Sequence, residues 1–206
     1  MTVEVDTPEG LMKGSSVIEV DTNVSGQLSI PTPGAVRARV RGEAVAVDLP
    51  NGRALFALLR SEDDVDFAKR IMFLMAPKGR DANGDPFLGR FNNMLEMTDP
   101  VELPATQAKI NPSLAKMKAQ PMLVTFGDLN DPTTVERVDP FNLQDSFGDG
   151  VSLRRITVQV TDDPVTKGIE KRFQWLGQIK GSGLTRDDFP ENVPVGAFSE
   201  MFKKGD

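Results

Sequence analysis

Carboxylates are the residues of this sequence best suited to chemistry, and many of them gather between residues 128 and 170. The sequence contains no His, no Cys and no Tyr. The missing His and Cys exclude Ser-His-Asp triads, thiolate nucleophiles and zinc–thiolate sites, and they remove the usual base near neutral pH. Catalysis would therefore depend on Asp and Glu, on Lys, on Ser or Thr, or on a metal held by oxygen atoms.

Two carboxylates at the correct separation could hydrolyse a glycosidic bond, and Asp162, Asp163 and Glu170 are the candidates for such a hydrolase. Most acids of this region stand beside Pro, Gly or Asn, where Asp side chains form Asx turns and helix caps. We therefore expect structural roles for most of these acids and assign no catalytic residue outright.

Asp81, Asn83 and Asp85 alternate along a loop and weakly resemble a calcium-binding loop. Gly84 is misplaced for the EF-hand pattern, and no bidentate Glu follows at the right distance. The alternative is a turn in which Asp85 caps a helix that begins at Pro86. We favour the turn and expect no metal or other cofactor. If a metal ion does bind, Asp81, Asn83 and Asp85 are its candidate ligands.

The overall charge bears on possible partners. The formal net charge is −6 and the isoelectric point is about 4.9, whereas non-specific binding to nucleic acid requires a basic surface. We therefore expect no nucleic-acid partner. The mean hydropathy is −0.27, and strongly apolar runs such as Ile71–Ala76 are far shorter than a membrane span.

Alternating and continuous apolar runs predict strands. These runs are Thr2–Asp6, Ser15–Val20, Ala35–Leu49, Arg53–Leu59, Met122–Phe126, Thr134–Val138 and Val151–Thr161. The first two are expected to form an opening hairpin with a long connection. The third switches its inward parity near Gly42, which indicates a bulge or bend. Ile169–Ile179 fits either a helix or a strand, and we favour a strand over Arg172–Gln178.

Helical spacing of apolar residues predicts two short helices, over Glu62–Met75 and Pro86–Met97. The first begins after a capping-box-like Ser61-Glu62-Asp63-Asp64 segment. Because strands flank both helices in the sequence, we predict an α+β fold with a mainly antiparallel sheet and the two helices inserted between its N- and C-terminal strand sets.

We expect a single domain over residues 1–206. Its core should include Met122–Phe126, which is apolar on both faces, and the single Trp, Trp175. Residues 98–120 contain three prolines and few large apolar residues, so we expect an irregular crossing segment there. Residues 184–206 are expected to form a peripheral tail.

Three stretches resemble a family of uncharacterised proteobacterial hypothetical proteins, some described as lipoproteins. They are TVEVDTPEGLMKGSSVIEV (Thr2–Val20), GEAVAVDLPNGRALFALL (Gly42–Leu59) and the long segment Pro121–Leu176. The resemblance implies a bacterial domain in the periplasm or cell envelope, held by a short N-terminal membrane anchor. Residues 1–206 do not include that anchor, so we expect membrane attachment only through an anchor that precedes them. The resemblance implies no activity and no site residues.

Three functions remain open from the sequence. The first is a non-enzymatic extracytoplasmic domain, tethered to a membrane or not, for binding a protein partner or for envelope assembly; the oligomeric state is not indicated. The second is a small-ligand or calcium-binding module that uses the Asp-rich turns. The third is the carboxylate-dependent hydrolase.

Overall fold

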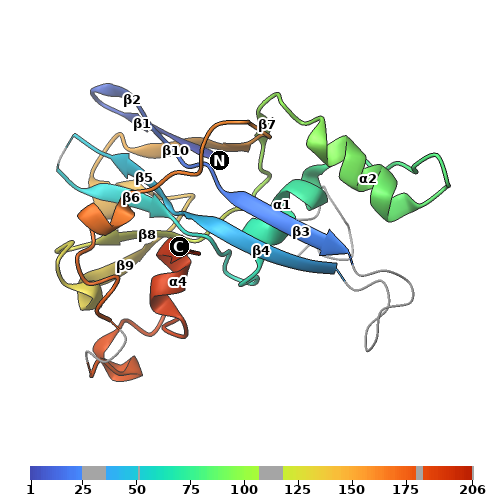
Figure 1. Ribbon diagram of the computed structural model, residues 1–206. Helices are drawn as coiled ribbons and strands as arrows, with labels where there is room; N and C mark the ends of the chain where they lie inside the picture. Colours follow the sequence, from blue (N-terminus) through green and yellow to red (C-terminus); the bar gives the residue numbers. More distant parts are fainter. Residues whose placement is uncertain (25–35, 51, 107–117, 180–182, 206) are drawn as a thin grey trace.

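The computed structural model describes residues 1–24, 36–50, 52–106, 118–179 and 183–205. The α+β prediction is confirmed, because the paired strands of this part of the chain are all antiparallel (Figure 1). The strands are β1 Thr2–Thr7, β2 Gly10–Ser15, β3 Glu19–Val24, β4 Val36–Glu43, β5 Val45–Asp48, β6 Ala54–Ala57, β7 Val101–Glu102, β8 Leu123–Phe126, β9 Val135–Val138, β10 Ser152–Val158 and β11 Lys203–Lys204. The α-helices are α1 Phe67–Met75, α2 Pro86–Leu95, α3 Gln144–Phe147 and α4 Phe198–Phe202.

The strands form three sheets, with the orders β2-β1-β10-β7, β5-β6-β8-β9 and β11-β4-β3. The sheet β5-β6-β8-β9 is the central layer, since every residue of β6 and β8 is buried. This confirms that Met122–Phe126 contains a central buried strand. Alternate residues of the two strands point to opposite faces, so the sheet carries a core on each side.

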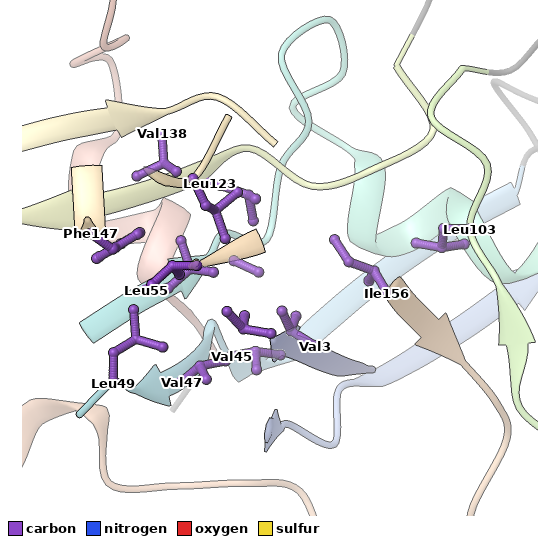
Figure 2. Packing of buried hydrophobic residues seen from close by; sticks show 14 of the residues in the cluster. Val3, Val45, Val47, Leu49, Leu55, Leu103, Leu123, Val138, Phe147 and Ile156 are labelled. Carbon is purple, nitrogen blue, oxygen red and sulfur yellow. The ribbon is translucent and has the colours of Figure 1, made fainter. Parts of the chain in front are cut away.

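The first core lies between the central sheet and the sheet that contains β1 and β10. Leu55 and Leu123 of the central sheet and Val3 and Ile156 of the opposite sheet are almost fully buried in it (Figure 2). Phe67 and Ile71 of α1 belong to the same cluster, and Met72 and Met75 pack against it, so α1 rests on this core along its length. The inserted helices therefore extend from the first core rather than forming a core of their own.

The second core lies on the other face of the central sheet and is rich in aromatic rings. Phe56 and Phe126 contact Phe173 and Phe202 there, with ring centroids 4.8 to 6.4 Å apart. The C-terminal segment contributes directly to this set, because Phe202 is fully buried. Residues 184–206 thus contain an essential part of the core, whereas the sequence predicted a peripheral tail. Phe198, Met201 and Phe202 have the i, i+3, i+4 spacing of a single helical turn, and so short a pattern does not show which core they join.

The parity switch predicted at Gly42 is present and turns a carboxylate inward. Gly42 has φ +147°, and Glu43, Ala44 and Val45 follow it as consecutive buried residues. Before this point the parity is regular, with Arg39 exposed and Val40 buried. The buried position of Glu43 is a direct consequence of this change in the strand.

Two predicted elements begin elsewhere than expected. Helix α1 begins at Phe67 rather than at Glu62, although Ser61 Oγ does accept the Asp64 N–H at 3.1 Å. The Asp64 carboxylate accepts the Asp66 N–H at 2.9 Å and so stabilises a turn that competes with the first helical turn. The opening hairpin pairs β1 with β2, so its connection is Pro8-Glu9 and not a long loop.

The segment after Gly168 is neither the strand nor the long helix considered from the sequence. Ile169–Lys171 forms a short 3-10 helix, and turns follow in the next residues. The strand expected over Arg172–Gln178 is therefore wrong, because Phe173 and Trp175 reach the second core from turns.

Of the segment 98–120, residues 107–117 lie outside the described residues. In the described part, no helix is long and apolar enough to cross a membrane.

Candidate functional site

The three catalytic candidates do not form one site. Asp162 and Asp163 are exposed, and Asp163 Oδ2 accepts the Thr161 hydroxyl at 2.7 Å within its own turn. Glu170 lies on the 3-10 helix and forms an ion pair with Lys203 of β11. Among the described residues, no hydrogen bond or ion pair joins Glu170 to either aspartate. The structure thus separates carboxylates that the sequence grouped together.

Glu170 and Lys203 adjoin the buried carboxylate of Glu43, which the sequence did not single out. Glu43 Oε1 accepts the Gly168 N–H at 3.0 Å, and Oε2 accepts the Ile169 N–H at 2.8 Å. The hydrogen bond from Lys203 is the largest cause that lowers the pKa of Glu170, with a further contribution from Glu43. This group links β4, the 3-10 helix and β11, so its role is to join chain segments that are far apart.

The three metal candidates lie in the connection between α1 and α2. Asp81 Oδ1 accepts the backbone N–H groups of Asn83 and Asp85, at 2.9 and 2.7 Å. Asp85 Oδ1 accepts those of Phe87 and Leu88, and Pro86 is the first residue of α2. The expected N-cap is confirmed, and one carboxylate oxygen of each aspartate, Oδ1, accepts two backbone N–H groups in forming the turn.

Helix α2 is the feature whose sequence and surroundings disagree. Its apolar side chains follow helical spacing, which is typical of a helix that packs against a core. Yet the only one of its ten residues that is buried is Gly89. Leu88 and Leu95 are 39% and 51% exposed. We call this the hairpin surface, and it consists of Phe87, Leu88, Phe91, Met94 and Leu95.

Helix α1 packs against one side of the hairpin surface. In Figure 1, α2 stands beyond α1 and away from the three sheets. Phe73 of α1 contacts Phe87, with centroids 5.1 Å apart, and Phe87 stacks on Phe91 at 6.4 Å. A hollow of about 530 Å³, lined in part by Met75, Arg90 and Glu102, lies beside the two helices. Within the hairpin surface, Phe87, Phe91 and Met94 are therefore half-buried, whereas Leu88 and Leu95 remain exposed.

Polar contacts fix the hairpin in one arrangement. The Arg90 guanidinium donates to the carbonyl oxygens of Leu74 and Ala76, at 2.6 and 3.1 Å, and so satisfies the C-terminal end of α1. Burial lowers the pKa of Arg90 from its usual value. At Gly89, a Cβ atom would lie 2.3 Å from the backbone of Arg80, so only glycine permits this approach. The exposed surface is thus held on a defined support.

Comparisons with protein-family models, with curated proteins and with solved structures found no match to this chain.

Proposed function

We propose that this chain is a non-enzymatic domain that binds a protein partner through the hairpin surface. The observation that carries the proposal is the exposure of Leu88 and Leu95 on α2, beside the half-buried Phe87, Phe91 and Met94. Contiguous exposed apolar surface on a soluble domain marks an interaction site more often than scattered exposed residues do. The fixed geometry at Arg90 and Gly89 also supports binding, because a rigid surface loses little conformational entropy in a complex.

The energy available from this surface is sufficient for a measurable effect. Complete burial of a leucine side chain contributes about 1.5 to 3 kcal/mol. Leu88 and Leu95 are 39% and 51% exposed, so covering the remaining surface of each would contribute about 1 kcal/mol. Together they would change the dissociation constant by about 30-fold.

The test uses site-specific photo-crosslinking in the cells that produce the protein. A benzophenone side chain at position 95 is expected to form a covalent adduct with one partner, which mass spectrometry identifies. The same group at position 11 is the matched control, because Leu11 is 44% exposed but lies on β2, outside the hairpin surface. The purified partner is then titrated against the wild type, the double variant Leu88→Asp/Leu95→Asp and Leu11→Asp.

Loss of binding by about 30-fold or more in the double variant, with Leu11→Asp unchanged, supports the proposal. The same adduct at both positions, or equal affinity of all three proteins, overturns it. Both leucines are exposed, so the double variant is expected to unfold at the same urea concentration as the wild type.

We also propose, on the resemblance to the lipoprotein-containing bacterial family alone, that the domain works in the periplasm or cell envelope. Attachment to a membrane through an N-terminal anchor belongs to the same proposal. The coding sequence upstream of Met1 tests it directly. A lipoprotein signal there supports the proposal, and an upstream coding sequence without such a signal opposes it.

A further inference from the structure

A second surface feature, which we call the sheet-end cleft, lies where β8 begins and β9 ends. It has a volume of about 480 Å³. Segments from several parts of the chain meet there, and they contribute Glu62, Lys118, Gln120, Arg137, Phe141 and Asn192. Its floor is formed by the buried ends of the central sheet, including Met122 and Val138. None of its lining residues belongs to the hairpin surface.

Phe141 at this cleft is 72% exposed, more than any other large apolar side chain in the described part of the chain. Its position is fixed, because its backbone N–H donates to Asp139 Oδ1 at 2.9 Å and the Asn142 N–H donates to the Asp139 carbonyl at 3.1 Å. A hydrogen-bonded turn thus holds an aromatic ring in solvent beside a cleft. Such a ring offers an apolar platform to a ligand.

Among the described residues that line the cleft, two cationic side chains are matched by two anionic ones. Arg137 donates to Glu62 at 2.6 Å, and the Lys118 ammonium group lies 5.9 Å from the centre of the Phe141 ring. Lys118 and Arg137 are offset by Glu62 and Asp139, so an anionic ligand gains little net attraction. A cationic ligand would have to compete with Lys118 for the ring. The cleft therefore favours a neutral ligand.

Polar side chains complete the recognition surface. The Gln120 amide is oriented by donation from Nε2 to the Leu103 carbonyl at 3.3 Å, and Asn192 is exposed at the same cleft. Planar amide, carboxylate and guanidinium groups hydrogen-bond to vicinal hydroxyl groups, while the C–H face of a sugar ring packs on an aromatic ring. A shallow cleft with both features matches a neutral carbohydrate better than a wholly apolar molecule.

We propose that the sheet-end cleft binds a neutral saccharide, with one sugar ring stacked on Phe141 and its hydroxyl groups hydrogen-bonded to Gln120, Asn192 and the Glu62–Arg137 pair. The site is distinct from the protein-binding surface proposed above, so the two proposals stand or fall separately. A variant in one surface is expected to leave the other unaffected.

The experiment is an NMR titration of the ¹⁵N-labelled chain with maltotriose, cellotriose and chitotriose. Glucuronic acid and glucosamine serve as the anionic and cationic probes. With at least one neutral trisaccharide, we expect shifts concentrated at residues 118–123, 137–141 and 192. Phe141→Ala and Asn192→Ala should each weaken this binding, the former about tenfold. Leu11→Ala is the control, since Leu11 is also exposed but lies on β2.

Localised shifts that weaken in Phe141→Ala and persist in Leu11→Ala support the proposal. No response to any of the three trisaccharides overturns it, and so do shifts that are unchanged in Phe141→Ala. Tighter binding of glucuronic acid or glucosamine than of the neutral sugars overturns the assignment to neutral ligands. The spectra of the free variants show whether each remains folded.

Discussion

Glu43 provides the sharpest test of how this fold is held together. Its side chain is 3% exposed, and its two oxygens accept the backbone N–H groups of Gly168 and Ile169. Replacing Glu43 with Ala removes both acceptors and leaves the Ile169 N–H without its partner in a buried position. Hydrogen bonds to charged groups contribute about 1.5 to 3 kcal/mol each, and removal of one partner from a buried charged group costs about 3 to 5 kcal/mol.

We therefore expect Glu43→Ala to lower the free energy of unfolding by about 3 kcal/mol, because relief of the buried charge offsets part of the loss. Glu43→Gln retains one acceptor oxygen, so about half of this effect is expected. In a chain of this size, the Ala variant should melt about 6 to 12 °C below the wild type. Glu19→Ala is the control, because Glu19 belongs to the adjacent strand β3 but its ion pair with Arg41 is exposed.

Urea unfolding measures these differences, followed by the fluorescence of Trp175. This residue is the single tryptophan and is buried in the second core. The expected order of stability is wild type and Glu19→Ala, then Glu43→Gln, then Glu43→Ala. Equal stability of the two Ala variants would refute the view that Glu43 anchors the 3-10 helix. If Glu43→Ala lowers the free energy of unfolding by less than about 1 kcal/mol, Glu43 contributes no more than an exposed carboxylate does, which also contradicts the reasoning.

Three further predictions test other parts of the fold. The hydrogen bond from Arg172 lowers the pKa of Asp48 below 3.8, so the pair stabilises the fold above pH 3.8 and loses this effect as the pH falls through the lowered pKa. By urea unfolding, Arg172→Met should cost up to about 1 kcal/mol at pH 7 and progressively less as the pH is lowered below 3.8. Gly14→Ala would place Cβ 1.9 Å from a backbone oxygen of β5 and should cost about 3 kcal/mol, whereas Gly177→Ala meets nothing within 4 Å and should be nearly neutral in the same assay. Cutting the chain within residues 98–120 separates β1 from β10 and β6 from β8, so neither half should show cooperative unfolding by circular dichroism; two cooperative halves would contradict a single domain.

Sequence patterns predicted the elements whose signal is local. The continuous apolar run at Met122–Phe126 identified a strand buried on both faces, and Asp85-Pro86 identified the start of α2, because each depends on neighbouring residues alone. The C-terminal segment was misjudged because its helical pattern is limited to Phe198, Met201 and Phe202 and follows two prolines. Phe202 reaches the second core through contacts with Phe56, far away in the sequence, and no local period records such a contact.

The candidate sites depended even more on long-range geometry. Acids that are close in the sequence, such as Asp163 and Glu170, have different partners in space. Glu43 binds backbone groups 125 and 126 residues away, so nothing near it in the sequence marks it as an anchor. The sequence could supply the inventory of carboxylates but not their pairing.

The apolar stripe of α2 had an ambiguous meaning until the structure placed the helix. The same spacing of Phe87, Phe91 and Met94 predicts a helix that packs on its own core or one that packs on another molecule. The contacts of Gly89 and Arg90 support the second alternative, which remains the proposal made above. Gly89 fits against the loop backbone and Arg90 satisfies the end of α1, so the helix is held in place while Leu88 and Leu95 remain exposed. Such fixed support would benefit a surface that binds a partner, because little conformational entropy is then lost on binding.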